Sequence, residues 1–271
     1  MRERTSGHAG RPPKEALQDQ AAGLRRLFAA PQPQWVPILL APERDLDNAA
    51  WLALLAQTCV EQGARTLIVD AARAQVASAF GLRARYDLAH ALNGDCAPVR
   101  TCIAAGANLG ILPAARALEQ SGRGAERLRR FAAGVRALAG PADCVLLVLP
   151  AAHGRSLAGF CDARTWSDAV VVAGATPSAD RQVIDTMRAI LSVADIGAFR
   201  LLFQGMAPDC AGSLYSRLAA AGARELGVST SNAGSVHDAS ALKRLVRLVR
   251  CRSTPGGGGA RGDSRPVETF S

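Results

Sequence analysis

Short apolar runs that alternate with longer helical runs constrain the fold of this chain more than any other feature of its sequence. Apolar runs of strand length lie at residues 35–40, 66–69, 109–112, 144–149, 169–173 and 199–203. Runs with helical spacing lie between and after them at 46–62, 87–92, 125–139, 179–193 and 214–226. Buried strands joined through helices form right-handed β-α-β crossovers. The alternation therefore predicts an α/β fold with a mainly parallel, doubly wound sheet.

The domain organisation follows from where this alternation begins and stops. A chain of 271 residues suits one α/β domain with tails. We expect a polar tail over 1–33, which carries a short helix at 14–30 and ends in a proline-containing linker. The α/β domain is expected over 34–251, and a glycine-rich, flexible tail over 252–271.

Charge and cysteine content narrow the classes of function. The net charge is +9, of which residues 1–33 carry +3 and residues 239–271 carry +5, so the middle is nearly neutral. A nucleic-acid-binding domain places its basic residues on the folded surface, so no nucleic acid is expected as a partner. Basic ends suit anionic lipid, an acidic protein or solvated tails. Seven cysteines without a C-x-x-C pair predict no metal site and a reduced, cytoplasmic location.

The last helical run, at 239–250, allows two interpretations. Its apolar side consists of Leu242, Leu245, Val246 and Val249, and its basic side of Lys243, Arg244, Arg247 and Arg250. It is either a helix that lies on a membrane surface or the last helix of the domain, packed on the sheet. The helix contains no Trp or Phe, which weakens the membrane interpretation. The serine-rich stretch before it, at 229–235, is expected to be a loop.

Two sets of residues carry a resemblance to a known family. The segment Asp19-Gln20-Ala21-Ala22-Gly23-Leu24-Arg25 resembles the D-Q-A-x-x-L-R signature that precedes the ATPase domain in the FlhG family of flagellar regulators, which are related to MinD. Five segments of the body are similar to successive parts of MinD and FlhG: 63–71, 81–88, 92–94, 108–114 and 170–177. The resemblance covers about residues 14–205. It implies a P-loop NTPase fold of MinD/ParA type, with ATP and magnesium as the cofactors of the family.

The residues that would bind ATP in that family are replaced here. The family's phosphate loop, K-G-G-V-G-K-T, falls on Glu43, Arg44, Asp45, Leu46, Asp47, Asn48 and Ala49. No glycine remains to turn backbone N–H groups inward, and neither lysine nor the magnesium-binding threonine is kept. Each carboxylate about 4 Å from a phosphate costs roughly 4 kcal/mol at an effective dielectric of 20.

Two further motifs of the family have each lost an aspartate of the ATPase site. In the second-strand motif D-x-D, Asp70 is kept and Ala72 replaces the second aspartate. In the strand that ends D-x-P-A-G, Val148 replaces the aspartate that supports magnesium. The resemblance thus predicts a protein without a cofactor and without ATPase activity.

The N-terminal signature implies a function that survives this loss. In the family this helix docks on the GTPase FlhF and places its glutamine near GTP, where a carboxamide can orient water. The corresponding residues are Asp19, Gln20, Ala21, Leu24 and Arg25, although the same pattern also suits an ordinary capped helix. The prediction is a non-catalytic, cytoplasmic regulator of flagellar number or placement. Its further expected partners are components of the flagellar switch (C-ring) and an active paralogue.

Three alternatives remain open at this point. The first is an active ATPase with an atypical loop. The second is a positioning adaptor at the inner membrane, which would bind lipid through the helix at 239–250. The third is a ParA-like DNA-binding protein, which the nearly neutral middle of the chain disfavours.

Overall fold

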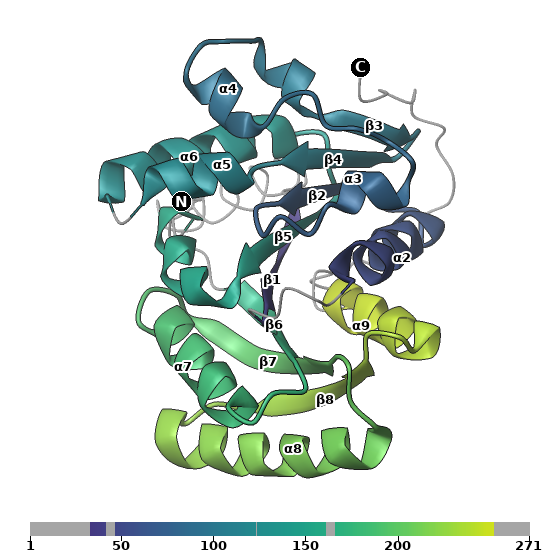
Figure 1. Cartoon of the computed structure of the whole chain (residues 1–271), viewed down its shortest axis with the longest axis vertical. Helices are drawn as coiled ribbons and strands as arrows, with labels where there is room; N and C mark the ends of the chain where they lie inside the picture. The colour runs from purple at the N-terminus through teal and green to yellow at the C-terminus, as the bar shows by residue number, and fades with distance from the viewer. Residues whose placement is uncertain (1–32, 42–46, 123, 161–165, 252–271) are drawn as a thin grey trace, which may run out of the picture. The chain divides into compact units, whose positions relative to one another are not determined.

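The computed structural model describes residues 33–41, 47–122, 124–160 and 166–251 (Figure 1). The helix expected at 14–30 and the tail expected over 252–271 lie outside these residues, so both stay predictions.

A mainly parallel sheet forms the centre of the domain. Its strands lie in the order β3-β4-β2-β5-β1-β6-β7-β8. Their bounds are β1 Gln34–Leu40, β2 Thr66–Asp70, β3 Ile103–Gly106, β4 Leu109–Pro113, β5 Cys144–Pro150, β6 Trp166–Ala173, β7 Ile196–Phe203 and β8 Thr230–Ser235. Every neighbouring pair is parallel except β3 with β4. The predicted α/β fold with a mainly parallel sheet is confirmed.

Helices cover both faces of this sheet (Figure 1). The helices of the described residues are α2 Asn48–Glu61, α3 Val76–Ala79, α4 Leu88–Leu92, α5 Ala115–Ser121, α6 Ala125–Ala139, α7 Ala179–Leu191, α8 Pro208–Ala221 and α9 Ala239–Cys251. Shorter turns of 3-10 helix are η1 Pro98–Thr101 and η2 Ala151–Phe160, and η3 Gly222–Leu226 is a π-helical turn. One core lies between the sheet and α4 to α8, and the other between the sheet and α2, α3 and α9.

The central strand β1 shows why these strands are apolar along their whole length. Leu39 contributes to the core between the sheet and α4 to α8. Ile38 and Leu40 contribute to the core between the sheet and α2, α3 and α9. Ile38 pairs in register with Val148 of β5 and with Val170 of β6. Because both faces of a parallel sheet are covered by helices, both sets of alternating side chains are buried. This burial explains the continuous apolar runs in the sequence.

The predicted strands at 35–40, 66–69, 109–112, 144–149, 169–173 and 199–203 correspond to β1, β2, β4, β5, β6 and β7. The prediction of a loop at 229–235 is wrong, because Thr230–Ser235 forms β8 and pairs with β7 in parallel. This strand lies at the edge of the sheet, and only Ala233 within it is fully buried. Its stability comes from backbone hydrogen bonds to β7, which leave no apolar signature in the sequence.

Helix α9 belongs to the folded domain. Leu242, Leu245 and Val246 are buried in the core that also contains α2, while Lys243, Arg244 and Arg247 are exposed. The structure therefore has the second of the two arrangements considered for this segment, a last helix packed on the domain. The side chains of Val249 and Arg250 lie outside the described part. In the residues that the structure covers, no helix is long and apolar enough to cross a membrane.

Candidate functional site

The amino end of α2 follows the central strand β1, at the carboxyl edge of the sheet. Parallel α/β folds bind ligands at this edge, and helix amino ends bind anions through their free N–H groups. Here the carboxylate of Asp47 accepts hydrogen bonds from the backbone N–H groups of Ala49 (3.1 Å) and Ala50 (3.4 Å). Two backbone donors of the first turn of α2 are therefore already bound by a side chain of the protein itself.

The neighbouring polar groups also have partners within the chain. The side chain of Asn48 accepts a hydrogen bond from the indole N–H of Trp51 at 3.1 Å. Gln204, buried at the end of β7, donates to the backbone carbonyl of Asp47 at 3.4 Å. Ala49 is half-buried and has no hydroxyl. Glu43, Arg44 and Asp45 lie outside the described residues, so their predicted places in the loop are untested.

Asp70 lies at the carboxyl end of β2, as expected from the second-strand motif. Its carboxylate is buried and accepts hydrogen bonds from the backbone N–H groups of Ala74 (2.9 Å) and Val76 (3.2 Å). Burial raises the pKa of Asp70, and these backbone hydrogen bonds offset part of that rise. The carboxylate therefore holds its own loop together. Ala72, in that loop, is half-buried against the core beside α2.

Val148 lies beside Asp70 in the sheet. The two residues are register partners on β5 and β2, and Val148 also pairs with Ile38 of β1. Its side chain is fully buried in the apolar core between the sheet and α2, α3 and α9. A magnesium ion needs oxygen ligands, and an isopropyl group offers none. No group of three or more His, Cys, Asp and Glu side chains that could hold a metal ion occurs in the described part of the chain.

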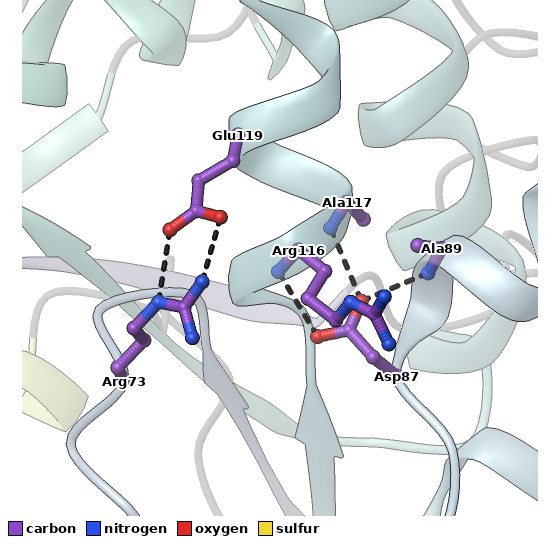
Figure 2. A network of polar contacts seen from close by, with 6 residues as sticks. All are labelled: Arg73, Asp87, Ala89, Arg116, Ala117 and Glu119. Atoms are coloured by element: carbon purple, nitrogen blue, oxygen red, sulfur yellow. Dashed lines mark hydrogen bonds and ion pairs between the residues drawn. The ribbon is translucent and has the colours of Figure 1, made fainter.

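A polar network next to Asp70 was not predicted from the sequence (Figure 2). Arg73, in the loop after β2, makes a two-point ion pair with Glu119 of α5, with nitrogen–oxygen distances of 2.9 and 2.7 Å. This pair lowers the pKa of Glu119 through the side-chain hydrogen bond and the charge of Arg73. Arg73 and Gln75 both adopt left-handed backbone conformations, with φ of 57° and 56°. Non-glycine residues rarely adopt such values, so the Asp70 and Glu119 contacts must hold the loop in place.

Asp87 is the second centre of this network. Its buried carboxylate accepts from the backbone N–H of Ala89 in α4 (2.9 Å) and from those of Arg116 and Ala117 in α5 (both 3.1 Å). Figure 2 shows this carboxylate between the ends of the two helices. The residue before α5, Ala114, has no side-chain oxygen to act as a cap. One aspartate thus caps two helices, and only its place before the helix at 87–92 could be read from the sequence.

A further hollow lies at the carboxyl ends of β6 and β7, between the amino ends of α7 and α8. Its volume is about 640 Å³, and its lining includes Gly174, Thr176, Asp180, Gly205 and Arg217. Asp180 and Arg217 form a two-point ion pair at 2.8 and 3.1 Å, which lowers the pKa of Asp180. Cys210 and Asp209 also face this hollow.

Of the residues predicted for a nucleotide site, the structure brings Asp47, Asn48, Ala49, Asp70, Ala72 and Val148 to one edge of the sheet or next to it. Asp19, Gln20, Ala21, Leu24 and Arg25 lie outside the described residues. The described residues of the edge form a closed set of internal contacts: a capped helix end, a carboxylate bound by its own loop, and a buried valine. The N–H groups of Ala49 and Ala50 are thus not free to bind a phosphate. Val148 has no side-chain oxygen that could bind a cation.

Comparison with known proteins identifies the fold. The sequence matches no family model and no curated protein. The MinD cell division protein of Aquifex aeolicus superposes with a TM-score of 0.56 at 14% identity, over 82% of this chain and 99% of that protein. Cobyrinic acid a,c-diamide synthase of Mycobacterium smegmatis, with bound ADP and magnesium, superposes with a TM-score of 0.59 at 18% identity, over 81% of this chain and 96% of that protein. A plasmid partition protein of Borrelia burgdorferi superposes with a TM-score of 0.57 at 11% identity, over 80% of this chain and 99% of that protein.

The chain therefore has the α/β fold of the MinD/ParA-like P-loop NTPases. Its almost complete coverage of those proteins means that the described domain corresponds to their whole body. At these identities the likeness concerns the fold alone. The closer resemblance to FlhG depends on the sequence motifs given above.

Proposed function

We propose that this chain is a MinD/ParA-like protein that acts by binding partners and does not turn over ATP. The observation that carries the proposal is the hydrogen bonding of Asp47 to the N–H groups of Ala49 and Ala50, two backbone donors at the amino end of α2 that a phosphate bound there would compete for. A nucleotide would have to displace this cap, which is worth about 1 kcal/mol, and then remain beside the displaced carboxylate.

The other described residues of this edge support the same proposal. Binding of ATP with magnesium requires carboxylate or hydroxyl oxygens next to the phosphates. Val148 and Ala49 supply none, and the Asp70 carboxylate is buried and hydrogen-bonded to its own loop. No step of ATP hydrolysis is therefore assigned to these residues.

Calorimetry with ATP and magnesium tests the absence of turnover and of binding. The expected result is no heat of binding at nucleotide concentrations up to about 1 mM, which corresponds to a binding free energy weaker than roughly −4 kcal/mol. The same titration on Asp47→Ala shows whether the Asp47 cap alone prevents ATP binding or whether the rest of the site also does. Magnesium-dependent binding in the micromolar range by the unchanged protein would contradict the proposal.

The proposed partner is a GTPase of the FlhF type, and the proposed role is control of flagellar number or placement. The support is the signature Asp19-Gln20-Ala21-Ala22-Gly23-Leu24-Arg25. A short helix of this kind is marginal in isolation and is expected to fold on the surface of the GTPase. Gln20 would orient water near GTP without adding charge. In this reading the MinD-like domain serves as a scaffold and as the site for further flagellar partners.

The partner proposal is tested by mixing the full chain with purified FlhF and measuring GTP hydrolysis. Stimulation is expected, with at least about a tenfold loss of the stimulated rate in Gln20→Ala, because one water-positioning group is removed. Gln18→Ala, two residues earlier and outside the signature, is the matched control and should keep full stimulation. Absence of stimulation by the unchanged chain, or equal loss in both variants, would reject the FlhF role.

Two other functions retain a specific observation in their favour. An active ATPase is favoured by the ADP and magnesium bound in the synthase of the same fold. The calorimetric experiment decides that case. A membrane-surface adaptor is favoured by the exposed basic side of α9, formed by Lys243, Arg244 and Arg247. Its apolar side is covered by the domain, so only electrostatic attraction remains, and binding to anionic liposomes that weakens as the salt concentration rises would support it.

A further inference from the structure

Exposed arginines lie on the loop before α4, on η1 and on α5, and two of them contact one tyrosine. We call Arg83, Arg85, Arg100 and Arg116, together with Tyr86, the arginine surface. All four arginine side chains are exposed, and Tyr86 is half-buried. Residues 83–86 lie in the loop before α4, Arg100 lies in η1, and Arg116 lies in the first turns of α5. Arg85 and Arg100, from two segments separated in sequence, therefore bring positive charge to the same tyrosine.

Contacts with Tyr86 hold two of these arginines in place. The guanidinium carbon of Arg85 lies 5.3 Å from the centre of the tyrosine ring, and that of Arg100 lies 5.1 Å from it. Arg100 also donates to the tyrosine hydroxyl at 3.5 Å, and the ring of His90 packs edge-on at 5.6 Å. A ring contact of this kind contributes about 0.5–1 kcal/mol at an exposed site and leaves guanidinium N–H groups free for a ligand.

The carboxylates near the arginine surface are already engaged or stand apart. Asp87 is buried and caps α4 and α5 through backbone N–H groups, and Glu119 is held at two points by Arg73. Asp95 is exposed and forms no ion pair with these arginines in the described part of the chain. Elsewhere in the domain some arginines, such as Arg188, Arg217 and Arg224, pair with a carboxylate. Within the described residues, none of the four arginines of the arginine surface thus forms an ion pair with a carboxylate.

Three observations favour a protein partner over a nucleic acid. Val99, next to Arg100, is 51% exposed and adds an apolar contact that a phosphate backbone would not use. Two guanidinium groups already lie over the ring of Tyr86, so a base that stacked on this ring would compete with them. In addition, the nearly neutral middle of the chain lacks the broad positive field of nonspecific nucleic-acid binding.

The neighbouring strand indicates the form of such a partner. β3 is the edge strand on this side of the sheet and follows η1 after one residue. Within the described residues it pairs with β4 on one side, and Ala104 and Gly106 are exposed. An extended peptide can add to such an edge through backbone hydrogen bonds while its side chains contact the adjacent surface.

We propose that the arginine surface binds an acidic, extended segment of a partner protein. The carboxylates of that segment would meet Arg85 and Arg100, and its apolar side chains would contact Val99. The proposal concerns a different part of the chain from the N-terminal signature, so it stands or falls independently of the FlhF role.

Fluorescence anisotropy of the full chain with a labelled peptide of alternating Glu and Val residues tests the proposal. The variant Arg85→Glu/Arg100→Glu should bind at least about tenfold more weakly, and raising the salt concentration from about 0.05 to 0.3 M should reduce the difference, as expected for exposed charges. The control Arg127→Glu/Arg181→Glu makes the same change of net charge at exposed positions on α6 and α7 and should bind normally. Thermal unfolding of both variants confirms that they fold.

Three outcomes would overturn the proposal. The first is failure of the unchanged chain to bind the peptide at concentrations up to about 1 mM, which is weaker than roughly −4 kcal/mol. The second is an equal loss of affinity in the control variant, which would mean that net charge alone drives binding. The third is tighter binding of single-stranded DNA or of phosphatidylserine vesicles than of the peptide, lost in the same Arg85/Arg100 variant, which would assign the surface to another class of partner.

Discussion

Asp70 and Val148 are register partners on the neighbouring parallel strands β2 and β5. The aspartate directs its carboxylate to the backbone of its own loop, and the valine side chain is buried in the apolar core. The fold is one associated with nucleotide binding. At the carboxyl edge of its sheet, however, these two side chains make internal contacts that stabilise the protein itself.

Val148→Ala is expected to lower the free energy of unfolding by about 2 kcal/mol, because two buried methyl groups are lost and a cavity remains. Val148 is fully buried between β1 and β2. Val99→Ala removes the same atoms from a side chain that is 51% exposed and should change stability by less than about 0.5 kcal/mol. Urea unfolding of both variants measures the difference, and equal effects would contradict the packing assigned to Val148.

Asp47→Ala is expected to cost about 1 kcal/mol of stability, the usual value for loss of a helix cap. The side chain accepts from Ala49 and Ala50 at the start of α2. The matched control is Asp209→Ala, which removes an exposed carboxylate from the first turn of α8 without breaking a side-chain cap. That change should cost only a few tenths of a kcal/mol through the helix dipole. If Asp47→Ala is as mild as the control, the cap has no energetic importance.

Asp87→Ala should be more damaging than Asp47→Ala, because one carboxylate caps both α4 and α5. With about 1 kcal/mol for each cap, the expected loss is roughly 2 kcal/mol. Hydrogen exchange should become faster at the amides of Ala89, Arg116 and Ala117 together. Faster exchange at Ala89 alone would show that α5 does not depend on this carboxylate. Asp87→Asn keeps one acceptor oxygen and should lie between the alanine variant and the unchanged protein.

Asp70→Asn and Asp180→Asn should shift the pH dependence of stability in opposite directions. Burial raises the pKa of Asp70 in the folded protein, so the folded state binds its proton more tightly than the unfolded state does. Its contribution to stability therefore falls as the pH rises from the unfolded value of about 3.9 through the raised folded value. The hydrogen bond and charge of Arg217 lower the pKa of Asp180, whose contribution is instead lost as the pH falls through the folded value.

The measurement is the free energy of unfolding in urea at several pH values on both sides of about 3.9, the ordinary pKa of an aspartate. Relative to the unchanged protein, Asp70→Asn should gain stability as the pH rises, and Asp180→Asn should lose it. The comparison uses slopes because Asp70→Asn also weakens a backbone hydrogen bond, which shifts its stability at every pH. Parallel slopes for the two variants would refute the opposite assignments.

The apolar strands could be predicted from the sequence because a parallel sheet buries both of its faces. Runs such as 144–149 and 199–203 are too apolar to be exposed, and their alternation with helical runs implies the crossover topology. The strand β8 could not be predicted, since Thr230–Ser235 is held by pairing with β7 and is mostly not fully buried. Short α3, α5 and β3 were likewise missed, because they are too short for a periodic pattern.

For the candidate site, the residue types at positions 47–49, 70, 72 and 148 were evident from the sequence, as was a polar start to α2. The sequence could not show that Asp70 binds its own loop, that Arg73 reaches Glu119, or that Asp87 caps a helix that begins 28 residues later. It also could not choose between a free and a packed α9. These contacts join residues far apart in the chain or depend on the backbone path of a loop. Local patterns therefore determined the layers of this protein, while only the folded backbone decided which polar group meets which partner.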